Sequence, residues 1–391
     1  MRDETEARWG AIFALWFAAL CAAGQFAKVG VILPELGARW PGQGALLGLT
    51  VSVVGGMGIV FGTTAGLVVA RAGARRLMIG ALIAGGLISG VQALGLPFWA
   101  MLASRVVEGV AHLTVVVAGP VLIAGAAGPR HQAAAATLWS TYFGLAFTIV
   151  AIFGLPLVRA HGPEALWAVH GALTLVSAAV LAVVLPREVV LPAPPLRLGR
   201  LLADHLEIYR SPWLGAPAFG FIFYTLIFVA IVTVTPGLVP PESRGTTAAL
   251  MPLLSILVSM SLGVQISRRL SAVLCAQLGF AGGAAAALLW AFATGPLAVL
   301  AACAMAASLG LSQGASFAAV PELNRSAEDR ARASGALAQM GSLGNTLGTP
   351  ILVTLIEAQG RGALTAFVLP VCLGGIAMHL WQANRRARAP R

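Results

Sequence analysis

MLASRVVEGVAHLTVVVAGPVLIAG, residues 101–125, is the stretch that decides the fold. Its apolar length is sufficient for a helix to cross the bilayer core, which is roughly 30 Å thick. Three ionisable residues interrupt the stretch, namely Arg105, Glu108 and His112. Their spacing places them on one face of a helix, and an ionisable side chain at membrane depth is unfavourable unless it faces protein or water. We therefore predict a membrane helix whose charged face points into the protein.

The composition of the whole chain indicates a protein with many membrane-spanning segments. Of its 391 residues, 58% are hydrophobic and only 10% are charged, and the mean hydropathy is +0.88. A soluble protein has about a quarter of its residues charged. The net charge of +11 does not indicate nucleic-acid binding, because the basic residues concentrate in every second connection between apolar segments. By the positive-inside rule, this distribution predicts a multi-pass protein of the cytoplasmic (inner) membrane with both termini cytoplasmic.

Twelve apolar segments are long enough to span the bilayer, which predicts an all-α membrane protein. They are residues 9–33, 44–69, 77–95, 98–124, 134–157, 165–185, 213–236, 247–266, 272–293, 295–319, 334–356 and 362–382. The longest connection between them, 186–212, is proline-rich and then basic. It predicts two pseudo-symmetric six-helix bundles, 1–185 and 213–391, the second with a basic tail, joined by a cytoplasmic linker. The glycines at 341, 344 and 348 predict close helix packing in the second bundle.

Two short motifs resemble those of a known family. The segment GLVVARAGARR, residues 66–76, and the segment RVVEG, residues 105–109, are similar to signatures of the major facilitator superfamily. The first resembles the gating motif in the loop between spans two and three, and its matching positions are Gly66, Arg71, Gly73, Arg75 and Arg76. Ala70 stands where that family has an aspartate. The second resembles the family's Arg-x-x-x-Gly signature in span four.

The resemblance covers the whole length of the chain and implies a transporter. It implies alternating access by a monomer, with spans one, four, seven and ten lining a central cavity. The Gly-Pro pattern that is typical of proton-driven drug antiporters in span five is replaced here by Gly154-Leu155-Pro156. The family is therefore indicated more clearly than the subfamily.

The energy source is predicted to be a gradient, because the chain's only lysine, Lys28, does not lie in a phosphate-binding loop. The four cysteines all lie in apolar runs, and their spacing predicts neither a metal site nor a disulfide framework. No nucleophile and base have a recognisable spacing. We therefore expect no enzyme activity, no cofactor and no metal.

Lys28 lies in the first span, and Gln25 is three residues before it on the same helical face. One interpretation is that Lys28 snorkels to the outer interface or pairs with Glu35, since the span ends about a turn later. The other is that Lys28 and Gln25 face the cavity. There, with the fold that the resemblance implies, they would lie opposite Arg105 and His112 and contact the substrate.

The fourth span leaves two interpretations open as well. Arg105 and Glu108 are three residues apart and can neutralise each other as a purely structural pair. Even then, Lys28 is left without a counter-charge, and the site as a whole carries a net positive charge. Such a site favours an anion, and arginine can hold a carboxylate through two hydrogen bonds. Glu108 and His112 are the candidate proton carriers.

The second half supplies aromatic and amide side chains rather than charges. Tyr224 and Phe228 lie four residues apart in the seventh span, Gln313 lies in the tenth and Asn345 in the eleventh. Singly, such residues more often hold helices together than bind a ligand. Together they predict a second wall suited to an organic body.

These observations predict a secondary active transporter that moves a small organic anion, a carboxylate-type metabolite, coupled to protons. The alternative is an efflux carrier for apolar drugs or metabolites, in which the charges serve only structure and Glu108 alone couples to protons. A membrane sensor or scaffold is the remaining class. The predicted partners are a small-molecule substrate, the lipid bilayer and the proton, and no nucleic acid.

Overall fold

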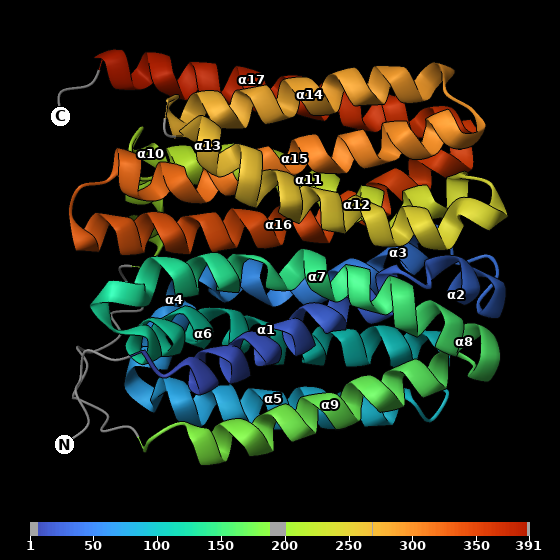
Figure 1. The fold of residues 1–391 in the computed structure, drawn as a ribbon, viewed down its shortest axis with the longest axis horizontal. Coiled ribbons are helices and arrows are strands. Elements are labelled where there is room, and N and C mark those ends of the chain that lie inside the picture. The colour runs from blue at the N-terminus through green and yellow to red at the C-terminus, as the bar shows by residue number, and fades with distance from the viewer. Residues whose placement is uncertain (1–6, 188–200, 268, 389–391) are drawn as a thin grey trace. The chain divides into compact units, whose positions relative to one another are not determined.

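The computed structural model describes residues 7–187, 201–267 and 269–388, and the regular elements within them are helices (Figure 1). By its contacts the chain divides into two compact units. The first comprises residues up to 32 and 64–196, and the second comprises 33–63 and 197–391. The consecutive bundles expected from the sequence differ from these units in segment 33–63, which packs with the second half of the chain. Each unit is described below by itself.

The first unit is built from long apolar helices. They are α1 (Trp9–Gly30), α5 (Ala74–Gln92), α6 (Phe98–Ser140), α7 (Tyr142–Ile149), the π-helical turn η2 (Val150–Gly154), α8 (Leu155–His161) and α9 (Pro163–Val184). Helix α4 (Gly56–Ala72) begins in the second unit and ends in the first. Helices α5 and α9 lie side by side (Figure 1), and glycines line their contact. A Cβ on Gly171 would lie 2.9 Å from the carbonyl oxygen of Gly86, so only glycine permits this approach.

The second unit contains the remaining helices. They are α2 (Leu33–Arg39), α3 (Ala45–Ser52), η1 (Val53–Gly55), α10 (Leu201–Arg210), α11 (Ala216–Val234), η4 (Thr235–Leu238), η5 (Pro241–Ser243), α12 (Arg244–Val258), η6 (Ser259–Gly263), α13 (Val264–Ser267), α14 (Ala272–Phe292), α15 (Gly295–Leu323), α16 (Ala327–Gln359), η7 (Gly360–Gly362) and α17 (Ala363–Arg388). The predicted close packing by glycines of α16 is confirmed. A Cβ on Gly344 would lie 2.7 Å from the carbonyl oxygen of Ile222, and one on Gly341 would lie 2.8 Å from the ring of Phe221.

Among the described residues, 11 helical stretches are long and apolar enough to cross a membrane. The last of them, Asp329–Arg388, contains both α16 and α17 with the turn η7 between them. The chain is therefore an all-helical, multi-pass membrane protein, and the count of twelve spans stays a prediction.

One predicted span needs correction. The expected fifth span, 134–157, begins within α6, and the apolar stretch that can cross the membrane is Tyr142–His161. Residues 134–140 form the end of α6, and the chain turns at Thr141 before α7 begins at Tyr142; α6 is itself kinked at Gly128, whose φ is 63°. Glycine adopts this left-handed conformation without steric cost, so residues beyond the kink form a separate helical segment before α7 begins.

Candidate functional site

Three charged side chains in the first unit are completely buried. Lys28 on α1, and Arg105 and Glu108 on α6, each have 0% of their surface exposed. On the same helix Val107 and Val110 are 58% and 50% exposed. The prediction that the charged face of this helix points into the protein is confirmed for Arg105 and Glu108.

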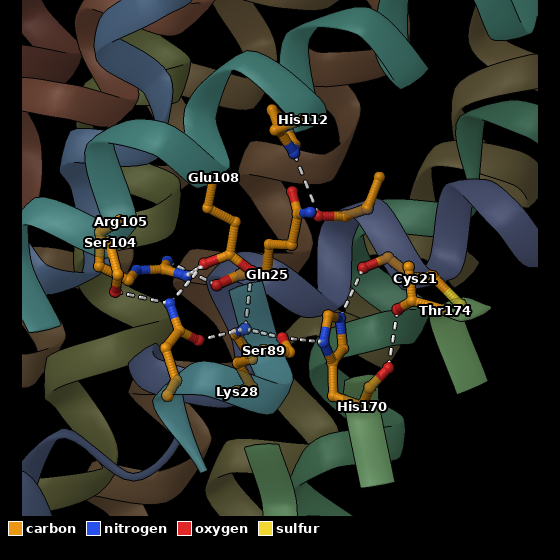
Figure 2. A network of polar contacts seen from close by, with 12 residues as sticks. Cys21, Gln25, Lys28, Ser89, Ser104, Arg105, Glu108, His112, His170 and Thr174 are labelled. Atoms are coloured by element: carbon orange, nitrogen blue, oxygen red, sulfur yellow. Dashed lines mark hydrogen bonds and ion pairs between the residues drawn. The ribbon is translucent and has the colours of Figure 1, made fainter. Parts of the chain in front are cut away.

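The ammonium group of Lys28 is fully occupied by hydrogen bonds. Its Nζ donates to Ser89 Oγ, to Gln92 Oε1 at 2.6 Å and to Glu108 Oε1 at 2.6 Å (Figure 2). A lysine ammonium has three N–H groups, so all of them have acceptors. Lys28 therefore neither snorkels to the surface nor pairs with Glu35. The latter forms an ion pair of 2.7 Å with Arg244 in the second unit.

Glu108 lies between two cations. Its Oε1 accepts from Lys28, and its Oε2 accepts from Arg105 Nη1 and, at 3.0 Å, from Gln92 Nε2. The expectation that Lys28 is left without a counter-charge is therefore wrong, because one carboxylate serves both cations. The predicted pair of Arg105 and Glu108 is present. The three side chains together carry a net charge of +1 inside the protein.

Backbone and amide groups of α1 complete the cluster. Arg105 Nη2 donates to the carbonyl oxygen of Gln25 at 2.6 Å. The side chain of Gln25 is 2% exposed, and its Oε1 receives no hydrogen bond from any described residue. Helix α5 can approach Gln25 closely because residue 85 is glycine, where a Cβ would lie 2.8 Å from Gln25 Nε2. A buried acceptor on the residue whose carbonyl binds Arg105 thus remains available for a donor on a ligand.

His112 is placed differently from its neighbours on α6. Its Nδ1 lies 3.1 Å from the carbonyl oxygen of Ala22, and its ring packs edge-on against Phe26 at 5.0 Å. Figure 2 shows its side chain on the opposite side of Gln25 from the ion cluster. The structure thus brings Lys28, Gln25, Arg105 and Glu108 together, with His112 bonded to α1 one turn further along.

Sequence reasoning missed three residues of the network: Ser89, Gln92 and His170. Ser89 Oγ lies 2.8 Å from His170 Nδ1, and His170 Nε2 lies 2.9 Å from the carbonyl oxygen of Cys21 (Figure 2). Ser89 and Gln92 lie three residues apart in an apolar span, which is a detectable signal for one polar face. His170 shares one helical face with Thr174 and Ser177, four and seven residues later, and this polar stripe is a signal that could have marked it.

The candidate residues of the second half lie in the second unit. Tyr224 and Phe228 are stacked with ring centroids 5.2 Å apart, and they are 3% and 2% exposed. Phe221 extends the stack, 5.3 Å from Tyr224. Gln313 and Asn345 are half-buried. No contact tests their assignment to the substrate, so that assignment stays a prediction.

The residues of the predicted gating motif flank the junction between α4 and α5. Gly73 has a φ of 87° there, a conformation that favours glycine. Arg75 donates from Nε to the carbonyl oxygen of Leu185 at 3.0 Å and from Nη2 to that of Ala182 at 2.6 Å, so it caps the last turn of α9. Gly66 lies in α4, Arg71 at its end and the exposed Arg76 in α5. Their gating role stays a prediction.

A polar contact in the second unit joins three of its helices. Tyr209 on α10 donates to Gln339 Oε1 at 2.7 Å, and Gln339 Nε2 donates to the carbonyl oxygen of Ile59 on α4 at 2.6 Å. Burial of the phenol raises the pKa of Tyr209 to about 12, so the hydroxyl keeps its proton at neutral pH.

The sequence was compared with known families. A family model described as Major Facilitator Superfamily matches residues 15–349, which include the buried ion cluster and the loop between α4 and α5. The chain belongs to the major facilitator superfamily. No curated protein sequence matches it. As a member of this superfamily it is a secondary transporter of a small molecule, embedded in a membrane.

Among the residues that the structure describes, no group of three or more histidine, cysteine, aspartate or glutamate side chains is placed to hold a metal ion. The four cysteines of this transporter are free and buried.

Proposed function

We propose that this transporter carries a small organic anion together with a proton. One observation supports the proposal most strongly: Glu108 holds the two buried cations, Lys28 and Arg105, with one carboxylate. In its ionised form Glu108 occupies the groups that would bind an anion. In its protonated form it no longer balances them, and an anion takes its place.

Electrostatics link the two binding events. Removing the charge of one partner from a buried ion pair leaves the other uncompensated, which is unfavourable by about 3–5 kcal/mol. Protonated Glu108 leaves two such cations, and a carboxylate substrate restores their balance. Because coupling between two ligands is reciprocal, proton binding tightens anion binding and anion binding favours proton uptake. That linkage is what a proton–anion symporter requires.

The surrounding groups indicate the class of anion. The guanidinium of Arg105 can hold a carboxylate through two hydrogen bonds. The unoccupied Oε1 of Gln25 is suited to a hydroxyl or amide hydrogen on the same substrate. The stacked rings of Tyr224 and Phe228 are the proposed contacts for an organic body, with Gln313 and Asn345 as polar contacts.

The same proposal includes the membrane arrangement. The apolar segments support twelve spans, with α16 and α17 as the last two. The distribution of arginines supports cytoplasmic termini and a cytoplasmic (inner) membrane. The family supports alternating access, which we propose that a monomer carries out.

Two measurements on the purified protein test the function. The first is thermal stability in detergent against small carboxylates, inorganic anions and lipophilic cations, because a ligand that binds only the folded state stabilises it. The second is uptake of the stabilising carboxylate into liposomes under an inward proton gradient. We expect concentrative uptake by the wild type and none by Glu108→Gln, Lys28→Gln or Arg105→Gln.

Glu207→Gln is the matched control, since Glu207 pairs with Arg332 at the surface and its carboxylate is 64% exposed. It should transport as the wild type does. Stabilisation by lipophilic cations or neutral drugs, and by no anion, would replace the proposal with the efflux alternative. Concentrative carboxylate uptake by Glu108→Gln would refute the coupling role of the acid.

A further inference from the structure

The polar network of the first unit extends beyond the proposed anion site. From Lys28 it continues through Ser89 to His170, which is 8% exposed. The network ends where His170 Nε2 meets the carbonyl oxygen of Cys21. Anion binding by Lys28 and Arg105 does not require this branch. A histidine buried in an apolar helix and bonded at both ring nitrogens therefore needs an explanation of its own.

The partners determine which ring nitrogen carries the hydrogen. The carbonyl oxygen of Cys21 can only accept, so His170 Nε2 is the donor. In a neutral imidazole Nδ1 is then an acceptor. Ser89 donates its hydroxyl proton to Nδ1, and its oxygen accepts from Lys28 Nζ. The hydrogen bonds consequently run in one direction, from Lys28 through Ser89 to His170.

We propose that His170 is a proton-binding site of this transporter, connected to Glu108 through Ser89 and Lys28. This inference rests on the proposed proton coupling and specifies where the proton goes. In the transfer, an N–H bond of Lys28 breaks and an O–H bond forms on Ser89. The original O–H bond of Ser89 breaks at the same time, and an N–H bond forms at His170 Nδ1. The proton of Glu108 then moves to the neutral Lys28 amine, which becomes an ammonium again.

The heavy atoms hold both states without moving. While Lys28 is the neutral amine, His170 Nδ1 donates to Ser89 Oγ, the hydroxyl of Ser89 donates to that amine, and Nε2 still donates to Cys21. The two bonds of Ser89 have then reversed their direction. Once the proton of Glu108 restores the ammonium, Lys28 no longer accepts from Ser89, and the hydroxyl hydrogen of Ser89 turns away from Nζ. The length of 2.8 Å between Ser89 Oγ and His170 Nδ1 suits either direction, and the 2.9 Å bond from Nε2 to Cys21 keeps its direction.

The packing around the imidazole holds His170 in place for its hydrogen bonds with Ser89 and Cys21. A Cβ on Gly24 of α1 would lie 2.9 Å from the ring, so the ring fits directly against that helix. The glycine contact between α5 and α9 brings Ser89 to the same ring. Both contacts leave little room for the imidazole to turn away from its partners.

The charged groups around His170 come from two helices. Helix α1 contributes Lys28, and α6 contributes Glu108 and Arg105, all of which act on the imidazole through their charges. Helix α5 faces it with the uncharged Ser89. Helix α8 also packs on α9, but its two basic residues are exposed; they are Arg159 and His161. The protonation of His170 is therefore expected to respond chiefly to the ion cluster.

The test uses the proton itself as the ligand. In detergent-solubilised, 15N-histidine-labelled full-length protein, the ring signals of His170 are assigned by their loss in His170→Gln, since the chain has six histidines. We expect the Nε2–H tautomer at alkaline pH and a doubly protonated ring after acidification. Glu108→Gln should lower the protonated fraction at a given pH, because two cations then face the ring without their acid.

Ser89 has a matched control on the same helix as His170. Ser177 is a buried serine of α9 whose Oγ has no hydrogen-bond partner among the described residues. We expect Ser89→Ala to slow proton exchange at His170 and proton-driven carboxylate uptake by about a hundredfold. Ser89→Thr should restore both, and Ser177→Ala should change neither.

Failure of this inference is distinguishable from failure of the proposed function. An Nδ1–H tautomer, a ring that stays neutral throughout, or a titration that is unchanged in Glu108→Gln would overturn the role of His170, even where uptake is proton-driven. A titrating His170 that responds to Glu108, in a protein that takes up no anion, would overturn the anion proposal alone. Loss of the tautomer signature in Ser177→Ala would show that the serine variants act through folding and would refute the relay.

Discussion

Neutralising Glu108 is the perturbation with the largest effect that the structure predicts. Glu108→Gln keeps the shape of the side chain but removes the negative charge that Lys28 and Arg105 share. Removing one partner of a buried ion pair destabilises a protein by about 3–5 kcal/mol. Each kcal/mol lowers Tm by about 2–4 °C for a unit of 150–250 residues, so we expect a fall of roughly 6–20 °C.

The assay is thermal unfolding in detergent, with an exposed pair as the reference. Glu207→Gln breaks the surface pair with Arg332, and such pairs contribute about 0–1 kcal/mol. In Glu108→Ala the space of the carboxylate is vacated, so formate, which supplies the same group, should restore part of the lost stability. At about a hundredfold excess over Kd the gain is about 2.7 kcal/mol.

The reasoning is refuted if Glu108→Gln unfolds at the same temperature as Glu207→Gln. It is also refuted if formate stabilises Glu108→Ala no more than it stabilises the wild type. Either result would mean that the buried cations do not depend on the acid for their balance.

Three further predictions follow from the contacts. Lys28→Gln should lower Tm less than Glu108→Gln does, because it leaves the neutral pair of Arg105 and Glu108 rather than two cations. Thermal unfolding of both variants gives the order of their Tm values, and the reverse order would contradict this electrostatic reasoning. Gly24→Ala should destabilise by about 1–3 kcal/mol, since the new Cβ overlaps the buried imidazole of α9, whereas Gly80→Ala, with nothing within 4 Å, should not. Tyr209 has a pKa raised from 10.0 to about 12, so its contribution to stability is complete below pH 10 and is lost as the pH rises through 12. Between pH 10 and 12 the free energy of unfolding of Tyr209→Phe should therefore fall less than that of the wild type. Equal decreases in the two proteins would contradict this prediction.

Local patterns predicted the burial of the charged face and the pair of Arg105 and Glu108 within it, but not the pair with Lys28. The spacing of Arg105 and Glu108 is a property of one helix, and helix geometry alone was enough to place both inside. The partner of Lys28 is 80 residues away, and the pair of Glu35 and Arg244 is separated by 209 residues. Such pairs depend on how helices pack, which hydrophobic periodicity does not determine. Lys28 was therefore predicted to be uncompensated, although Glu108 bonds to it.

Boundaries and single polar residues were harder to predict for a related reason. The turn at Thr141 moved the start of the fifth span, because largely apolar residues lie on both sides of it and do not signal a break. Thr174 and Ser177 share a helical face with His170, but only the contacts with Ser89 and Cys21 show its place in the network. In contrast, the glycines of α16 were predicted to pack closely, because their spacing on one face is itself the packing signal.

The central claim is that protonation of Glu108 frees Lys28 and Arg105 for an anion. Its most direct test is the number of protons taken up when the stabilising carboxylate binds to the purified protein, measured with a pH-sensitive dye in weakly buffered solution. The account predicts one proton per bound anion at a pH at which Glu108 is ionised, and none in Glu108→Gln. Anion binding by the wild type without proton uptake would contradict it.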